Sequence, residues 1–363
     1  MMAAVLLTGH GGFDMLEYRT DVPVPAPRAG EVLIRVAAAG VNNTDINTRT
    51  GWYSATVTSG STAGGAAGFQ TDVALDASWT GTPLQFPRIQ GADVCGHIAA
   101  VGARVGPARI GTRVLVRNML RSYTGYRPYE CWTIGSECDG GFAQFAVAPA
   151  AETHAVRCDW SDAELASVPC AYSTAENMLH RAAVGAELVL ITGASGGVGS
   201  AAVQLAKRRG ATVIALAAAA KADEVRALGA DRVIDRNADL LAELGPDSID
   251  VVLDVVGGPQ WPQLIAVLRR GGRYAIAGAI AGPMAQIDLR QLYLKDLSLF
   301  GCTFQEDAVF ANLISYIEAG EIRPLVARTY PLRDIVQAQT DFLTKTHTGK
   351  LVLIPPPDRS RPE

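Results

Sequence analysis

The sequence predicts an α/β protein in which a doubly wound parallel sheet is joined to a second, strand-rich domain. Before about Ser161, short apolar strand patterns separated by turn residues predominate, for example at residues 31–42, 97–102, 111–116 and 143–149. After Ser161, strand patterns alternate with helical stretches, and this alternation requires crossovers between parallel strands. A length of 363 residues is sufficient for two domains, each with its own core.

The segment 191–216 is the most informative stretch, because it has the pattern of a buried strand, a glycine turn, an amphipathic helix and a second strand. Ala194, Gly196 and Gly199 occupy the three spaced positions of a dinucleotide fingerprint, with Ala replacing the first glycine. A helix beginning near Gly197 would direct its free N–H groups and positive end at a pyrophosphate. We expect a nicotinamide dinucleotide here, with a purely structural turn as the alternative. The expected cofactor-binding residues of this turn are Ala194, Ser195, Gly196, Gly197, Val198 and Gly199.

Composition excludes several other classes of protein. A net charge of −4 argues against nucleic acid or an anionic membrane as the main partner. No apolar run approaches the roughly 20 residues needed to span a bilayer, and residues 1–7 lack the features of a secretion signal. Six scattered cysteines do not form a disulfide framework, so a cytoplasmic location is the expectation.

Residues 54–87 interrupt this regular pattern. They are rich in Gly, Ala, Ser and Thr and have almost no periodicity. Such a long structureless run is unusual in a compact domain, so it is either a functional lid or a mobile insertion. If it is a lid that limits the size of the substrate, deleting residues 59–77 should change substrate preference and leave dinucleotide affinity intact.

Several sequence blocks resemble the medium-chain dehydrogenase/reductases. They are residues 40–53, 91–102, 253–258 and 271–278, the glycine turn, and GKLVLIP near the end. Within that superfamily the chain resembles the zinc-free quinone oxidoreductase branch, which includes zeta-crystallin, and it is also similar to the enoyl thioester reductases. The resemblance implies a Rossmann domain at residues 158–303 and a GroES-like catalytic domain at residues 1–157 and 304–363.

The resemblance also permits a comparison with zinc alcohol dehydrogenases, ligand by ligand. By this resemblance, Asn42 occupies the position at which zinc alcohol dehydrogenases carry Cys, Ala92 the position at which they carry His, and Asp93 the position at which they carry Glu. Only Cys170 occupies a matching ligand position, and the lobe of the structural zinc keeps too few cysteines. We therefore expect no metal, and we interpret Cys170 as a small buried residue.

The second strand of the nucleotide-binding segment ends without a carboxylate, at residues 213–218. An acid there usually binds the ribose hydroxyls of NAD, so its absence, with Lys221 just beyond, favours NADPH (NADP); a solvated helix-terminal lysine is the alternative. Two further strand ends are expected beside the nicotinamide, with ordinary strand termini as the alternative. Their residues are Val256, Gly257, Ala277 and Gly278.

The resemblance places Asn42 and Tyr53 in the catalytic site. A Tyr at this position in similar reductases hydrogen-bonds the substrate or donates a proton; aromatic packing is the alternative role for Tyr53. Asp45 is expected to hold the loop through local hydrogen bonds. Without a metal, alcohol oxidation lacks its usual route to an alkoxide, whereas a quinone or activated alkene accepts hydride from NADPH more readily.

The resulting expectation is an NADPH-dependent oxidoreductase that reduces a quinone or activated alkene (enone or enoyl) without a metal. The alternatives are an alcohol or aldehyde dehydrogenase with a degenerate metal site and a non-enzymatic NADPH-binding protein. The expected partners are a small-molecule acceptor and a second copy of the chain. Homodimer formation is expected because residues 297–304 look like an apolar edge strand that would otherwise invite aggregation.

Overall fold

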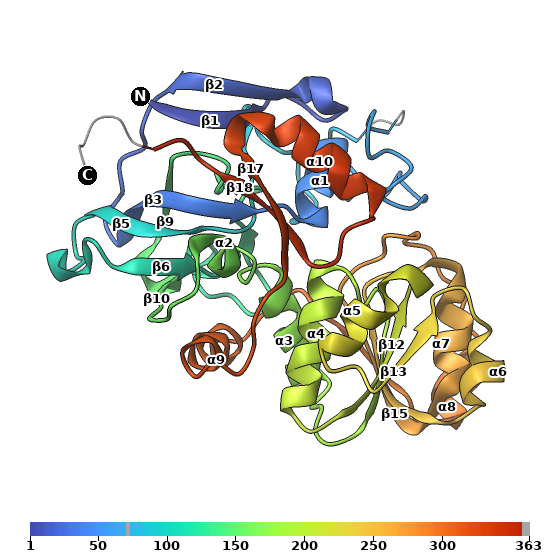
Figure 1. Ribbon diagram of the computed structural model, residues 1–363. Coiled ribbons are helices and arrows are strands. Elements are labelled where there is room, and N and C mark those ends of the chain that lie inside the picture. The colour runs from blue at the N-terminus through green and yellow to red at the C-terminus, as the bar shows by residue number, and fades with distance from the viewer. Residues whose placement is uncertain (70–72, 358–363) are drawn as a thin grey trace.

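The computed structural model describes residues 1–69 and 73–357, which form a strand-rich lobe above a lobe built on a parallel sheet (Figure 1). Residues 70–72 of the expected insert and the chain beyond Pro357 lie outside the described residues. Within the described part of the chain, no helix is both long and apolar enough to cross a bilayer.

The lower lobe contains a six-stranded parallel sheet in the order β13-β12-β11-β14-β15-β16. The chain begins at the central strand β11 and winds outward in both directions, so the expected doubly wound sheet is confirmed. The strands are β11 (Leu188–Ile191), β12 (Thr212–Ala217), β13 (Arg232–Asp235), β14 (Ile249–Asp254), β15 (Leu268–Ile276) and β16 (Ser298–Gly301). The helices that flank it are α3 (Ala171–Arg181), α4 (Gly197–Arg208), α5 (Ala222–Ala227), α6 (Leu240–Leu244), α7 (Trp261–Val267) and α8 (Leu289–Leu294).

Both faces of this sheet are covered, because successive side chains of a strand point to opposite sides. In β11, Val189 and Ile191 belong to the core shared with α3 and α4, whereas Leu190 belongs to the core shared with α7. This two-sided burial explains the nearly continuous apolar character of the central strands.

The upper lobe is built around β3 (Glu31–Gly40), which pairs with β5, β9 and β18. Its larger sheet runs β10-β6-β5-β3-β18-β17, and a smaller sheet runs β2-β1-β4. The remaining strands are β1 (Met2–Leu7), β2 (Leu16–Val22), β4 (Arg88–Ile89), β5 (Cys95–Val101), β6 (Arg113–Val116), β7 (Met119–Leu120), β8 (Trp132–Thr133), β9 (Phe145–Pro149), β10 (Thr153–Ala155), β17 (Val326–Pro331) and β18 (Lys350–Ile354). The helices are α1 (Asn43–Thr50), α2 (Asp162–Leu165), α9 (Asp307–Glu318) and α10 (Ile335–Thr344).

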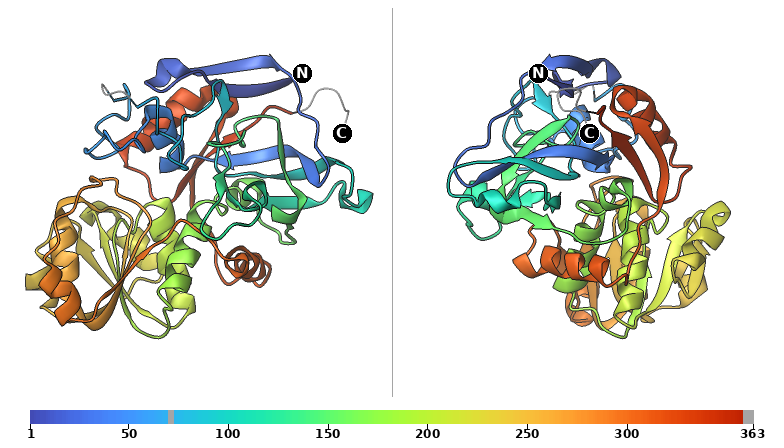
Figure 2. Two further views of the ribbon diagram at one scale, coloured as in Figure 1. Left: turned by 180° about the vertical axis from the view of Figure 1, so that it is seen from behind. Right: turned by 60° about the vertical axis from the view of Figure 1, so that its left-hand side comes forward.

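The C-terminal segment returns to the upper lobe. Figure 2 shows β17 and β18, in red, rising from the lower lobe toward the blue strands of the N-terminal segment. Val352 and Leu353 of β18 pair with Gly40 and Ala39 of β3. This pairing brings Lys350, at the start of β18, beside the loop that follows β3. Before that return, α9 packs on α3, so one apolar core continues across the junction of the lobes.

The described residues of the insert, 54–69 and 73–87, fold against the upper lobe and also reach the lower lobe, where the N–H of Ser61 donates to the carbonyl oxygen of Ile280 (3.1 Å). Val57, Val73 and Ala77 form a small core with Trp52 and Phe69. The Arg49 guanidinium, wholly buried, donates to the carbonyl oxygen of Gly65. The described residues of the insert contain no helix and no strand. The segment therefore owes its shape to contacts with its neighbours rather than to local periodicity.

Candidate active site

The glycine turn lies between β11 and α4, as the sequence predicts, but the residue that forms the tight turn differs. Gly193 adopts a φ of +59°, so it is Gly193, not the fingerprint position Ala194, that needs a left-handed conformation. Ala194 is buried and its N–H donates to the carbonyl oxygen of Leu216 on β12 (3.1 Å). An alanine is tolerated at the first fingerprint position because Ala194 does not need the positive φ that Gly193 adopts.

The other two glycines have the geometry that the fingerprint requires. Gly196 is the N-cap residue of α4 and is exposed, and its neighbours Ser195, Gly197 and Val198 are half-buried. A Cβ on Gly199 would lie only 2.2 Å from the carbonyl oxygen of Gly193, so no larger residue would let α4 lie this close to β11. The turn therefore presents open backbone at the N-terminus of a twelve-residue helix.

Asp254, at the end of β14, organises the second turn. Its wholly buried carboxylate accepts hydrogen bonds from Thr192 Oγ1 (2.6 Å), from the N–H groups of Val256 (2.8 Å) and Gly257 (3.1 Å), and from the hydroxyl of Tyr274. The sequence did not single out Asp254, although an acid at the end of an apolar strand is the signal that could have done so.

Gly257 and Gly278 bring the ends of β14 and β15 together. A Cβ on Gly257 would meet Ala279 at 3.1 Å, and one on Gly278 would meet the carbonyl oxygen of Val255 at 2.9 Å. Ala277 is half-buried, and its N–H donates to the carbonyl oxygen of Asp254 (3.1 Å). Close packing of the two turns thus accounts for these glycines, and their contact with a nicotinamide stays a prediction.

The end of β12 has no acid, but it has cations that only the fold brings together. Lys221 donates to the carbonyl oxygens of Lys345 (2.7 Å) and His347 (2.6 Å) in the loop between α10 and β18. The Lys345 ammonium donates to Asn43 Oδ1 (2.9 Å), and its burial near Lys221 lowers its pKa to about 7. Burial and the neighbouring lysines likewise lower the pKa of His347 to about 4.

The same loop contacts the glycine turn. The N–H of Gly349 donates to the carbonyl oxygen of Ser195 (3.0 Å). The adjacent Thr348 is buried, and its hydroxyl has no hydrogen-bond partner among the described residues. Among the described residues Lys221 and Lys345 have no carboxylate within salt-bridge distance. Such cations, with an unpaired buried hydroxyl beside a helix N-terminus, fit a phosphate-bearing dinucleotide.

On the upper lobe, Asn42 is the N-cap residue of α1 and lies in a buried polar cluster. Its backbone N–H donates to Asp45 Oδ2 (2.8 Å), and its Nδ2 donates to Asp93 Oδ2 (2.8 Å). Asp45 also accepts from the N–H of Ala92 (3.2 Å), so the expected loop-holding role of Asp45 is confirmed. Burial, with Asp93 nearby, raises the pKa of Asp45 to about 7. The Lys350 ammonium completes the cluster, donating to Asn42 Oδ1 and to Asp93 Oδ2 (2.9 Å).

Tyr53 lies just beyond the other end of α1 and points back to it. Its hydroxyl donates to Thr44 Oγ1 (3.1 Å), and Trp79 Nε1 of the insert donates to the same oxygen (2.8 Å). The rings of Tyr53 and Trp79 are tilted by 43° with centroids 4.9 Å apart. Burial raises the pKa of Tyr53 well above its ordinary value, so the phenol stays protonated. Sequence reasoning did not single out Thr44 within the block of residues 40–53, and it did not find Trp79, which belongs to no recognisable motif.

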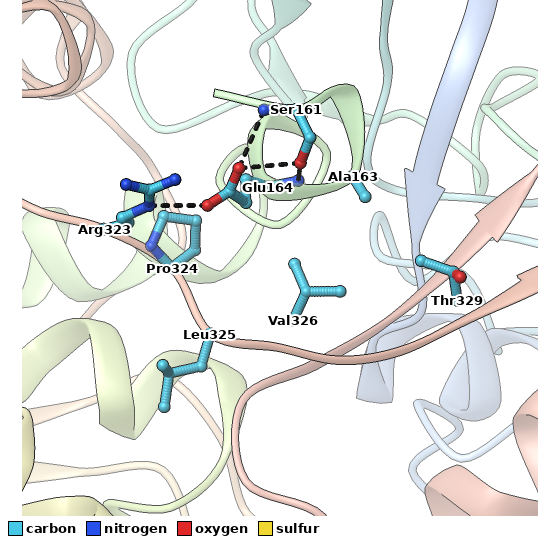
Figure 3. Close-up of a pocket in the computed structure, with 8 residues that line it drawn as sticks. All are labelled: Ser161, Ala163, Glu164, Arg323, Pro324, Leu325, Val326 and Thr329. Atoms are coloured by element: carbon cyan, nitrogen blue, oxygen red, sulfur yellow. Dashed lines mark hydrogen bonds and ion pairs between the residues drawn. The ribbon is translucent and has the colours of Figure 1, made fainter. Parts of the chain in front are cut away.

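The cavity in Figure 3 lies away from this constellation. It has a volume of about 520 Å³ and is bordered by Glu164 of α2, by Arg323 and Leu325 of the segment that leads into β17, and by Val326, the first residue of β17. None of the expected site residues lines it. The candidate active site is instead the surface where the two glycine turns face the Asn42 loop.

Comparisons with known proteins agree with this architecture. A family model described as "Alcohol dehydrogenase GroES-like domain" matches residues 28–157, and one described as "Zinc-binding dehydrogenase" matches residues 197–319. The chain is 30% identical to a quinone oxidoreductase from Lama guanicoe, with 98% of each chain covered. It is 28% identical to the NADPH-dependent alkenal/one oxidoreductase of Arabidopsis thaliana, over 98% of this chain and 80% of that one.

Solved structures extend the similarity. A candidate alcohol dehydrogenase from Sinorhizobium meliloti 1021 is 46% identical, with a TM-score of 0.86 and coverage of 98% and 97%. A mycobacterial protein solved in complex with NADPH is 27% identical, with a TM-score of 0.76 and coverage of 98% and 100%. Fold and relatives together define an oxidoreductase. The chain belongs to the medium-chain dehydrogenase/reductase superfamily, in its quinone oxidoreductase branch.

One of these family descriptions implies zinc, but the side chains present do not fit it. The part of the chain that the structure describes contains no group of three or more His, Cys, Asp and Glu side chains able to hold a metal. Cys170 is only half-buried, not fully buried as the sequence suggested, and desolvation with Asp93 nearby raises its pKa. A thiol that stays protonated, an amide and a carboxylate already paired with an ammonium do not form a zinc ligand set.

Proposed function

We propose that the protein catalyses the NADPH-dependent reduction of a quinone or an activated alkene, with no metal ion involved. The observation that carries this proposal is the shared hydrogen bonding of Thr44 and Tyr53 next to the Asn42 loop. It provides a hydrogen-bond donor at the place where the superfamily resemblance puts the acceptor.

The donor follows from counting protons. A hydroxyl has one proton to donate and two lone pairs that accept. Thr44 Oγ1 accepts from Trp79 Nε1, and one further hydrogen bond joins Thr44 to Tyr53. In that bond Tyr53 donates and Thr44 Oγ1 accepts, so the proton of Thr44 is the one left unused. The remaining proton is available to the carbonyl or quinone oxygen of an acceptor.

This proton serves as a hydrogen-bond donor rather than as an acid. An aliphatic hydroxyl such as that of Thr44 is too weak an acid to transfer its proton at neutral pH, and burial also raises the pKa of Tyr53, so neither hydroxyl would act as the acid. When bound, NADPH would supply the hydride that reduces the acceptor, and the proton that completes the reduction would come from water. A fixed O–H group would stabilise the negative charge that develops on the acceptor oxygen. Trp79 holds the hydroxyl pair in place, so the insert contributes directly to the site.

The preference for NADPH rests on the cations beside β12. Ala217 and Ala218 end this strand where NAD-dependent sites place an acid. Lys221 ties the loop that carries Lys345 and His347 to this end of the sheet. A 2′-phosphate would pair with the Lys345 ammonium, which donates a hydrogen bond to Asn43 and lies 3.7 Å from the centre of the Phe342 ring.

Substitution of the hydroxyls tests the proposal. Thr44→Val and Tyr53→Phe should lower kcat with a quinone or enone by roughly 10- to 100-fold each, since one oxyanion donor is typically worth that much or more. Thr50→Val is a matched control, because the Thr50 hydroxyl bonds only within α1, to Ile46 (2.9 Å) and Asn47 (3.4 Å). NADPH binding, followed by fluorescence, should not change in any of the three. Unchanged turnover in both Thr44→Val and Tyr53→Phe would contradict the proposal.

An alcohol dehydrogenase is the second candidate, favoured by the similarity to the Sinorhizobium meliloti protein. Chelator-treated protein that oxidises alcohols with NADP and fails to reduce quinones, enones and enoyl thioesters would select it. NADPH binding without turnover in either direction would select a non-enzymatic role.

We also propose that the enzyme is a homodimer. β16 is an edge strand of the six-stranded sheet, and Leu299 on it is 41% exposed. Neighbouring α8 has no buried residue, and its Leu289, Tyr293 and Leu294 are exposed as well. An unpaired apolar edge of this kind is usually covered by a partner.

A further inference from the structure

Lys350 has unusual surroundings for a lysine. Only 3% of the residue is exposed, and its ammonium lies between Asn42 Oδ1 and Asp93 Oδ2. Asp93 is wholly buried; its Oδ2 also accepts from Asn42 Nδ2 (2.8 Å), and its Oδ1 accepts from the N–H of Cys170 (2.6 Å). Asn42, Asp93 and Lys350 therefore form a closed ring of hydrogen bonds in which the Lys350 ammonium carries the positive charge.

The ring occupies the positions at which a metal would be expected. By the resemblance described above, Asn42, Asp93 and Cys170 occupy positions at which zinc alcohol dehydrogenases carry zinc ligands or residues next to those ligands. The described residues nevertheless contain no group of side chains that could hold a metal. We propose that the Lys350 ammonium is the resident cation of this site, and that it excludes a divalent metal and takes over its organising role. This inference deepens the metal-free function proposed above.

Electrostatics explain the exclusion. The Lys350 ammonium lies 2.9 Å from Asp93 Oδ2 and cancels the attraction that this carboxylate would exert on a divalent ion. An ion entering there would also meet the full positive charge of the ammonium within a few ångströms. Because both side chains are buried, the effective dielectric constant around them is low, and the repulsion between the ammonium and a metal ion is stronger than it would be at the surface. The oxygens that could bind a metal, on Asn42 and Asp93, are already occupied by the ammonium.

The organising role follows from where the lysine stem runs. A Cβ on Gly197 would lie 2.9 Å from Lys350 Cδ, so the stem passes against the first residue of α4. The N–H of the preceding residue, Gly349, donates a hydrogen bond to the carbonyl oxygen of Ser195. One side chain thus connects the phosphate-facing turn of the lower lobe to the Asn42 loop of the upper lobe. Lys350 is a positioning residue, acting through Asn42.

Metal binding tests the exclusion directly. Asn42→Cys would add a second thiol beside Asp93 and Cys170 while Lys350 is still present. In Asn42→Cys/Lys350→Met the same ligands remain without the ammonium, and Asn42→Cys/Lys350→Arg restores the charge. Titration with Co²⁺, followed by the visible absorption of a cobalt–thiolate bond, gives the affinity. Removal of one positive charge at this range should tighten binding by about 100-fold or more in the Met variant relative to the other two.

Equal Co²⁺ affinity in the three variants would overturn the inference. If the variants do not fold, wild-type protein dialysed against Zn²⁺ provides the second measurement. It should retain less than a tenth of an equivalent, roughly, since the ammonium competes for the same oxygens. A stoichiometric zinc that is lost on Asp93→Asn would overturn the inference. Both readouts measure metal rather than turnover, so they are independent of which acceptor the enzyme reduces.

Discussion

Arg49 should anchor the insert locally rather than stabilise the whole fold. It is fully buried on α1 and donates to Gln339 Oε1 (2.9 Å), to the carbonyl oxygen of Gly11 (2.8 Å) and to that of Gly65. In Arg49→Met a linear apolar side chain fills the space, and three buried acceptors lose their donor. Gly65 belongs to the insert, so the lost contact there would release it from α1.

Two effects oppose each other in this substitution. Three hydrogen bonds from a charged donor contribute roughly 4–5 kcal/mol, at about 1.5 kcal/mol each. Burial lowers the pKa of Arg49 from 12.5 to about 10, which corresponds to roughly 3 kcal/mol of cost for keeping the buried group charged. The difference leaves a net loss of only about 1–2 kcal/mol in the free energy of unfolding.

Chemical denaturation and limited proteolysis would separate the local effect from the global one. We expect a small shift of the denaturation midpoint and much faster cleavage within residues 54–69. Acceptor KM should rise while NADPH affinity is retained, because the insert carries Trp79 to Thr44. Arg19→Met, which removes an exposed arginine paired with Asp21, is the control. A global loss above about 4 kcal/mol with an equally protected insert would refute the reasoning, since the hydrogen bonds would then outweigh the desolvation cost.

Three further outcomes are expected. NADPH affinity should be highest below pH 7 and weaken as the pH rises, because a bound phosphate favours protonated Lys345, whose pKa is lowered to about 7 in the free protein. In fluorescence titrations the Kd of NADPH should rise up to about tenfold per pH unit above 7, and Lys345→Gln, or NADH in place of NADPH, should flatten that profile. Equal slopes for both cofactors would count against the phosphate contact. Deletion of residues 59–77 should change the ranking of acceptors of different size at constant NADPH affinity; identical relative kcat/KM values across the panel would rule out a lid. Light scattering at micromolar concentration should give the mass of a dimer. Leu299→Lys should convert the dimer to a monomer, whereas Ile110→Lys should not, since Ile110 is an exposed apolar residue of the upper lobe, away from β16. A monomeric wild type would disprove the dimer.

The parallel sheet and its cofactor turn are predictable because their causes are local. Strands with two buried faces are continuously apolar, and a strand followed by a glycine turn and an amphipathic helix has a strong pattern. Every strand expected after Ser161 is present. The strand β17 was not expected because most of its residues are exposed, so it lacks an apolar signature. Helix α1 was also missed, since its buried residues are largely polar: Asp45, Asn47, Thr48, Arg49 and Thr50.

The functional site is less predictable for the same reason. Asn42 and Tyr53 could be found through a resemblance, but Thr44 and Trp79 are ordinary residues until the fold makes them share a hydrogen bond. Lys345 has no motif either; it is recognisable only because Lys221, 124 residues earlier, donates to its carbonyl oxygen.

The sequence by itself determined the doubly wound sheet, the position of the glycine turn, the missing acid after β12 and the poor match to a zinc ligand set. These properties depend on the order of neighbouring residues, which periodicity and turn chemistry make readable. Only the tertiary structure decided what stands in place of the ligands. Lys350 and Asn42 are 308 residues apart, and the pairing of β18 with β3 brings the ammonium to the amide. A buried charge is stabilised only by partners that reach it in space, and no local pattern in the chain records which partners those will be.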